Sequence, residues 1–108
     1  MTSATLEGVF DHIDANGDAF VARLMDYVRH PSISAQNKGI TEVSQLLVGM
    51  LGKLGMEVEA VKTSGHPMVL GKSPHKPGKP TVLLYGHYDV QPPEPFEAWV
   101  SPPFEPTI

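Results

Sequence analysis

Hydrophobic residues in the first quarter of the chain recur at steps of three and four positions and keep a single phase. That spacing predicts one long amphipathic helix, carried by Leu6, Val9, Phe10, Ile13, Gly17, Phe20, Val21, Leu24, Tyr27 and Val28. Because Gly17 lies on the apolar face, we expect it to let a neighbouring element approach, at a helix-propensity cost of about 1 kcal/mol. A kink with Asp18 as a new N-cap is the alternative. We expect Pro31 to stop the helix.

A second apolar stripe predicts another helix in the middle of the chain. It consists of Val43, Leu46, Leu47, Met50, Leu51 and Leu54. Thr41 stands just before the stripe and is the predicted N-cap. Gly55 follows it and suits the left-handed residue that ends many helices.

The hydrophobic period changes after Gly55 to one typical of strands. Residues 56–62 and 68–72 are predicted to be short strands joined by a turn, and a loop rich in proline and glycine over 73–80 leads to a third. Residues 82–85 are apolar on both faces, as in a central strand covered by helices on each side. Two helices followed by three strands predict an α/β fold whose layers are incomplete.

This third predicted strand ends in a glycine, a histidine and an aspartate. His87 and Asp89 are two residues apart, so their side chains point the same way if the backbone stays extended. In open α/β sheets, functional residues collect at the carboxyl ends of strands. A neutral imidazole suits zinc, and a nearby carboxylate can fix its tautomer. A single pair of this kind also occurs by chance, so the spacing alone is weak support for a metal site.

Longer stretches around this pair resemble a known family. Residues 81–108, TVLLYGHYDVQPPEPFEAWVSPPFEPTI, resemble the first metal-binding segment of the di-zinc metallopeptidases. That family includes carnosinase-like dipeptidases, glutamate carboxypeptidase, acetylornithine deacetylase, succinyl-diaminopimelate desuccinylase and aminoacylase, and the dipeptidase branch is the most similar. Residues 28–36, VRHPSISAQ, resemble the family's segment after its first helix. The resemblance therefore covers nearly the whole chain, and it implies the N-terminal part of a three-layer zinc-exopeptidase-like catalytic domain.

The resemblance also implies an activity and a role for each residue of the pair. His87 would be a metal ligand, and Asp89 would be the supporting catalytic carboxylate that positions a ligating imidazole. The complete site would hold two Zn²⁺ ions, with Co²⁺ or Mn²⁺ as alternatives, and would hydrolyse the amide bond of a dipeptide or an N-acyl amino acid. A homodimer of the full-length protein is compatible with the resemblance.

The family's metal-bridging aspartate, general-base glutamate and remaining ligands lie beyond the position that matches Ile108. Residues 1–108 are therefore expected to be a truncated N-terminal portion of the catalytic domain, inactive alone. A non-enzymatic module that retains the fold is the alternative.

Composition narrows the remaining functions. A net charge of −4 with scattered Lys and Arg argues against a nucleic-acid surface. The absence of cysteine leaves histidine and carboxylate as metal donors. No secretory signal is visible near Met1 and no apolar stretch is long enough to cross a bilayer, so we expect a cytoplasmic protein without membrane contact.

The other histidines and the single tryptophan have simpler interpretations. His12, His30, His66 and His75 have no partner at ligand spacing and are not expected to bind metal; the last two are assigned to solvated turns. Trp99 lies in a proline-rich loop, where it either packs against the domain or lines a substrate cleft.

Overall fold

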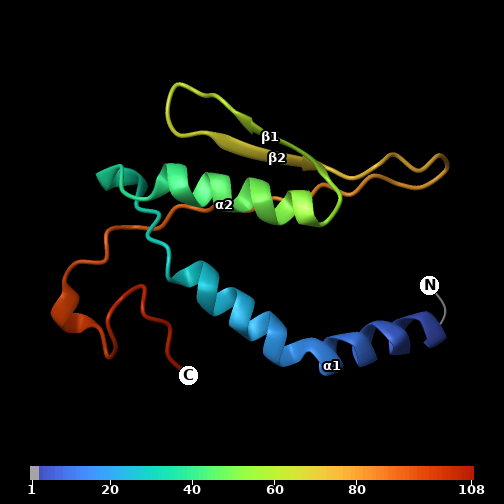
Figure 1. The fold of residues 1–108 in the computed structure, drawn as a ribbon, viewed down its shortest axis with the longest axis horizontal. Coiled ribbons are helices and arrows are strands. Elements are labelled where there is room, and N and C mark those ends of the chain that lie inside the picture. The colour runs from blue at the N-terminus through green and yellow to red at the C-terminus, as the bar shows by residue number, and fades with distance from the viewer. Residues whose placement is uncertain (1–2) are drawn as a thin grey trace.

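The computed structural model describes residues 3–108 and shows a mixed α/β chain in which the first helix is set apart from the remaining elements (Figure 1). The elements in order are α1 (Ser3–Val28), the 3-10 helix η1 (Ser34–Gln36), α2 (Ile40–Lys53), β1 (Glu57–Val61), β2 (Met68–Lys72) and the 3-10 helix η2 (Phe96–Ala98). The two predicted helices and the first two predicted strands are thus confirmed.

Helix α1 is continuous, as the apolar period predicts, and it ends at Val28, shortly before Pro31. The close approach predicted at Gly17 is wrong, and Asp18 does not begin a new helix, although α1 bends along its length (Figure 1). The helix has no break there, and a Cβ added at Gly17 would meet no atom within 4 Å, so no element approaches it. Along α1 the apolar stripe stays exposed, including Phe10 and Leu24, because few contacts join this helix to the rest of the described chain.

Helix α2 begins earlier than predicted. Its N-cap is Gly39, in the left-handed conformation with φ 74°, and Val43 N donates to Gly39 O at 3.0 Å. Thr41 therefore lies inside the first turn and is not the cap. The end of α2 agrees with the sequence, because Gly55 has φ 79°. Its N–H donates to Gly52 O at 2.9 Å, and the N–H of Met56 donates to Leu51 O at 3.3 Å, which together form a Schellman motif.

Strands β1 and β2 form an antiparallel hairpin, with Glu57 opposite Lys72 and Val61 opposite Met68. The hairpin lies against α2 (Figure 1). Gly71 makes this contact close, because a Cβ there would lie 3.1 Å from Leu51 Cδ1 and 3.2 Å from Met56 Sδ.

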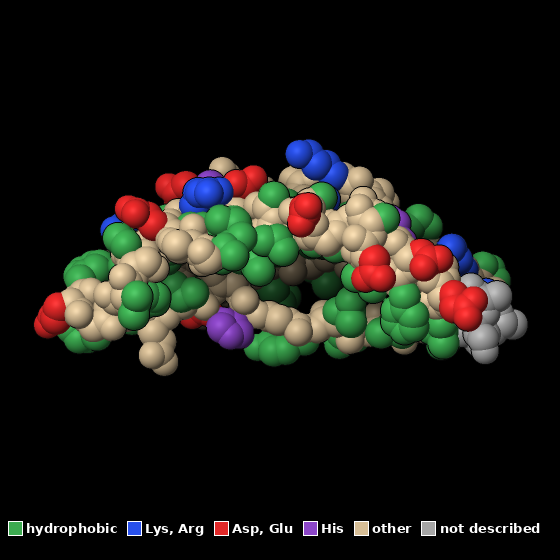
Figure 2. All heavy atoms as spheres, turned by 90° about the horizontal axis from the view of Figure 1, so that it is seen from below, with side chains coloured by type: hydrophobic (Ala, Val, Ile, Leu, Met, Phe, Trp, Pro, Cys, Tyr) green, Lys and Arg blue, Asp and Glu red, His purple; other side chains and the backbone are tan. Residues whose placement is uncertain are grey.

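The third predicted strand is not formed. The sheet has two strands, β1 and β2, which pair with each other, and residues 81–85 pair with neither of them. A strand requires ladder hydrogen bonds to a neighbour, and an apolar sequence cannot supply these by itself. The side chains of residues 82–85 are consequently between 75% and 90% exposed. Figure 2 shows several separate groups of apolar side chains, with acidic side chains among them, around a central hollow.

The buried core is small and is formed by the segment of residues 32–43, which includes η1 and the start of α2. Its apolar members among the described residues are Ile33, Ile40 and Val43. The radius of gyration is 17.3 Å, whereas a compact domain of this length has about 13 Å. Within residues 3–108, no helix has the length and apolar character needed to cross a membrane. The candidate site is built on this small core.

The left-handed glycine at the start of α2 gives a testable prediction for stability. A Cβ at Gly39 would lie 1.8 Å from Pro31 O, whereas one at Gly55 would meet nothing within 4 Å. Both positions have positive φ, so Gly55→Ala should cost about 1–2 kcal/mol from backbone strain alone. Gly39→Ala should cost clearly more, because backbone must also move. Thermal unfolding of the two variants measures the difference, and equal shifts would show that the contact with Pro31 is relieved without cost.

Candidate metal-binding site

The candidate site forms where two distant segments pair beside the start of α2. Val90 N donates to Ser32 O at 2.7 Å, and Ile33 and Val90 form a parallel bridge. Ile33 also exchanges two hydrogen bonds with Lys38, of 2.8 and 3.1 Å, which close the loop around η1. These backbone contacts bring Ser34, at the start of η1, next to Asp89.

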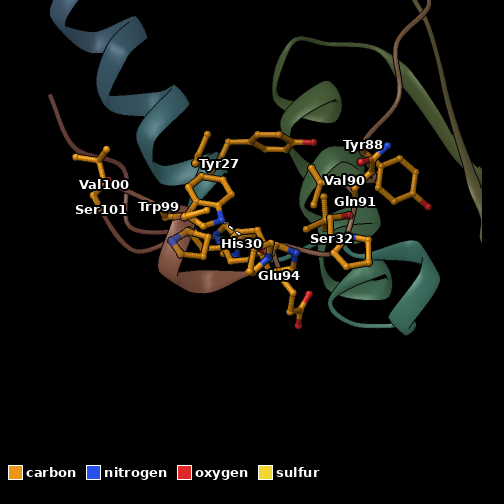
Figure 3. Close-up of a pocket in the computed structure, with 18 residues that line it drawn as sticks. Tyr27, His30, Ser32, Tyr88, Val90, Gln91, Glu94, Trp99, Val100 and Ser101 are labelled. Atoms are coloured by element: carbon orange, nitrogen blue, oxygen red, sulfur yellow. Dashed lines mark hydrogen bonds between the residues drawn. The ribbon is translucent and has the colours of Figure 1, made fainter.

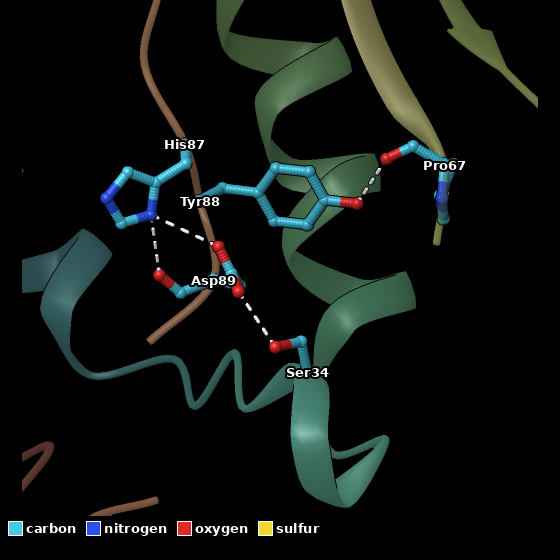
Figure 4. A network of polar contacts seen from close by, with 5 residues as sticks. All are labelled: Ser34, Pro67, His87, Tyr88 and Asp89. Carbon is cyan, nitrogen blue, oxygen red and sulfur yellow. Dashed lines mark hydrogen bonds and ion pairs between the residues drawn. The ribbon is translucent and has the colours of Figure 1, made fainter. Parts of the chain in front are cut away.

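His87 and Asp89 lie together, on the side of the chain away from Tyr88 (Figure 4). His87 Nδ1 is 2.9 Å from Asp89 O and 3.1 Å from Asp89 Oδ1. A backbone carbonyl can only accept a hydrogen bond, so Nδ1 must carry the hydrogen. In the neutral ring this leaves the lone pair on Nε2, where it can bind a metal ion. The two side chains therefore point together, as their spacing predicts.

The carboxylate of Asp89 has a second donor on its other oxygen. Ser34 Oγ donates to Asp89 Oδ2 at 2.8 Å (Figure 4). This hydrogen bond is the main reason that the pKa of Asp89 lies below its usual range. Desolvation opposes it, and the hydrogen bond and charge of His87 add smaller lowering effects. Asp89 is consequently ionised at neutral pH and acts as an acceptor for both neighbours.

Tyr88 anchors the same segment to the hairpin. Its hydroxyl donates to Pro67 O in the turn between β1 and β2. Burial, and then the charge of Asp89, raise the pKa of Tyr88, which keeps the hydroxyl protonated as that donor. The side chain therefore holds the segment of residues 87–89 against the hairpin turn.

Two cavities adjoin this segment. One of about 520 Å³ is lined by Ser34, His87 and Asp89 together with apolar side chains of α2 and β2. The other, of about 820 Å³, lies between the end of α1 and the loop that carries Trp99 (Figure 3). Tyr27 and Tyr88 border both. A largely apolar cavity with a few convergent polar groups is the usual form of a small-molecule site.

Trp99 is half-exposed and is held by its own loop. Its indole Nε1 donates to Pro93 O at 2.8 Å, which fixes the ring to its own loop. The residue is still 52% exposed and lines the larger cavity. The structure thus supports anchoring within the loop and leaves the ring accessible to a ligand.

His66 differs from its predicted place in a solvated turn. It is half-buried, and its Nε2 lies 3.2 Å from Ser34 O, so it ties the hairpin turn to η1. Neither this contact nor the Ser34 hydrogen bond to Asp89 has a local sequence signal, because each joins segments more than 30 residues apart.

The donor set within the described residues fits one part of a zinc site. Across residues 3–108, no group of three or more His, Cys, Asp or Glu side chains could hold a metal ion. A catalytic zinc site usually has about three protein ligands. The chain therefore offers one imidazole in the ligating tautomer, with its supporting carboxylate, and other ligands would have to come from elsewhere.

Comparisons with known proteins place this arrangement in context. No protein-family model matches the chain. The chain is 33% identical to the Cys-Gly metallodipeptidase dug1 of Schizosaccharomyces pombe, over 96% of this chain and 25% of that protein. It is 31% identical to the Beta-Ala-His dipeptidase of Rattus norvegicus, over 94% of this chain and 24% of that protein. The chain thus spans about a quarter of the length of the curated relatives it matches.

The structural comparison also finds a metallopeptidase. The crystal structure of an M20 family metallo-carboxypeptidase, Sso-CP2 from Sulfolobus solfataricus, matches with a TM-score of 0.75 and 39% sequence identity. The match covers 82% of this chain and 20% of that one. A succinyl-diaminopimelate desuccinylase of Psychromonas ingrahamii is also 35% identical, over 82% of this chain and 22% of that protein. By sequence and by structure, the chain is homologous to the M20 metallopeptidases.

Proposed function

We propose that residues 1–108 are the N-terminal portion of the three-layer catalytic domain of a metal-dependent hydrolase. Its reaction is cleavage of the amide bond of a dipeptide or an N-acyl amino acid. The observation that carries the proposal is the geometry at His87, where Nδ1 faces two oxygens of Asp89 and Nε2 is left to bind a metal. The homology to metallopeptidases supports it.

Each candidate residue has a distinct role in this proposal. His87 binds the metal through Nε2, and Asp89 orients the imidazole and raises its basicity. Zn²⁺ is the proposed ion, two per complete site, with Co²⁺ or Mn²⁺ as alternatives. Such ions polarise a substrate carbonyl and lower the pKa of bound water. The remaining ligands and the proton-transferring carboxylate belong, in this proposal, to a longer protein.

A dipeptide is the favoured substrate class. The two dipeptidases match 94% or more of this chain, whereas the desuccinylase matches 82%. An N-acyl amino acid is the second class. A homodimer of the full-length protein and a cytoplasmic location stay predictions.

The activity test compares the full-length protein with the 108-residue chain. The full-length protein should lose hydrolysis of Cys-Gly or β-Ala-His on chelation and regain it with Zn²⁺, Co²⁺ or Mn²⁺. The 108-residue chain alone should be inactive even with excess zinc, because its described residues lack a three-donor site. Metal-dependent turnover by the purified chain would show that the site is misplaced, and a full-length protein inactive on dipeptides and N-acyl amino acids would refute the proposed reaction.

The lack of a three-donor site also favours a second candidate, a non-enzymatic module that retains this fold. The same assay separates the two, because only the enzyme gains activity with added metal.

A further inference from the structure

We infer that Ser34 is a positioning residue of this site, whose hydroxyl fixes the Asp89 carboxylate in the orientation that holds the His87 imidazole. This inference rests on the proposed function and adds to it a residue from a different segment. No sequence pattern around Ser34 indicates such a role, and the contact joins positions 55 residues apart.

The two oxygens of Asp89 are divided between two donors. Oδ1 faces His87 Nδ1 at 3.1 Å, and Oδ2 accepts from Ser34 Oγ at 2.8 Å. Within the part of the chain that the structure describes, no other side chain donates to Oδ2. The terminal torsion of an aspartate is broad, so a carboxylate held at one oxygen can rotate. The second hydrogen bond removes that freedom and keeps Oδ1 directed at the imidazole.

Ser34 is itself held by contacts that do not involve its hydroxyl. Its carbonyl accepts from Asn37 N at 3.1 Å and lies 3.2 Å from His66 Nε2. The preceding residue, Ile33, is bridged to both Lys38 and Val90. The position of Ser34 is thus set by η1, by the hairpin turn and by the segment that carries the site. Removing the hydroxyl alone should leave this framework in place.

The hydroxyl of Ser34 does not hydrogen-bond within η1, the helix to which Ser34 belongs. In η1, no side-chain capping hydrogen bond is formed by the N-cap residue Ile33, and Ser34 Oγ is directed at Asp89 (Figure 4). Ser44 offers a contrast, because its buried hydroxyl donates to Thr41 O within α2 at 2.7 Å. Ser44→Ala is therefore a control for the loss of a serine hydroxyl, because this more deeply buried hydroxyl makes its hydrogen bond within α2.

The test compares Ser34→Ala, Ser34→Thr and Ser44→Ala in the full-length protein. Ser34→Ala should weaken zinc affinity or lower kcat by about 10-fold or more, the range for a residue that orients a ligand. KM should change little, and the thermal midpoint of the metal-free protein should match that of Ser44→Ala. Ser34→Thr retains the hydroxyl and should restore metal affinity and kcat. Unchanged affinity and kcat in Ser34→Ala, or losses that Ser44→Ala reproduces, would overturn the inference.

A spectroscopic measurement separates this inference from the proposed function. Nitrogen NMR of metal-free protein reports which ring nitrogen of His87 carries the hydrogen. The Nδ1–H form should predominate in the unaltered protein and decrease in Ser34→Ala. That result would support the positioning role even if the full-length protein hydrolyses no tested substrate. An identical tautomer ratio in the two proteins would contradict it even if the enzyme is active.

Discussion

Replacing His87 by alanine should remove bound metal and activity together in the full-length protein. In the proposed function His87 binds the metal through Nε2, because its Nδ1 faces Asp89, and the described residues hold no group of three donors that could replace it. The loss should exceed the roughly 10–100-fold effect of altering an outer partner of a ligand. Metal analysis after dialysis and steady-state kinetics measure the two quantities.

The control for this substitution is His75→Ala. His75 is exposed in the loop of residues 73–80, away from the site, and should leave both metal content and rate unchanged. Full activity and metal content in His87→Ala would exclude the ligand role. A loss shared by His75→Ala would indicate that the effect of removing a histidine is not specific to the site.

Asp89→Asn should lower the rate of hydrolysis while leaving most of the metal bound. The hydrogen bond from His87 Nδ1 to the backbone carbonyl of residue 89 is independent of the side chain, so the Nδ1–H form should decrease but remain the major one. Most of the metal should therefore remain, while the rate falls about 10–100-fold as the imidazole loses its charged partner. If Asp89→Asn lost metal as completely as His87→Ala, the carboxylate would itself have to be a ligand.

The sequence predicts those elements whose pattern is local. The apolar periods predict both helices, and the change of period after Gly55 predicts the hairpin to within a residue at each end. Gly55 itself is identified because a helix end needs a left-handed residue there. The N-cap of α2 is missed because the left-handed backbone at Gly39 already starts the helix, two residues before Thr41, which has the better capping side chain.

Features that depend on distant pairing are predicted less well. The apolar run of residues 82–85 has strand composition, yet no strand forms, because pairing needs a neighbour that the described chain does not place alongside. The candidate pair His87 and Asp89 is found from local spacing and from the family resemblance. Ser34 and His66 are not found, since their contacts depend on how η1, the hairpin turn and residues 87–90 meet in space.

The unpaired run has a consequence for the 108-residue chain expressed alone, which should self-associate. Residues 82–85 are 75–90% exposed and pair with no strand of the described chain. Burying a side chain of this size gives about 1.5–3 kcal/mol, so four of them are comparable with the entire stability of a small domain, about 5–15 kcal/mol. Such a segment also invites pairing between copies.

A charge placed within the run should reduce this association. Leu84→Lys puts an ammonium where two copies would pair, and breaking an apolar strand with a charge opposes aggregation. Val100→Lys is the matched control, because Val100 is fully exposed outside the run and the two substitutions change net charge equally. Sedimentation velocity should show oligomers for the unaltered chain and for Val100→Lys, and mainly monomer for Leu84→Lys. A monodisperse monomer with a sharp thermal transition in the unaltered chain would mean that the small core around Ile33 and Val43 is sufficient by itself.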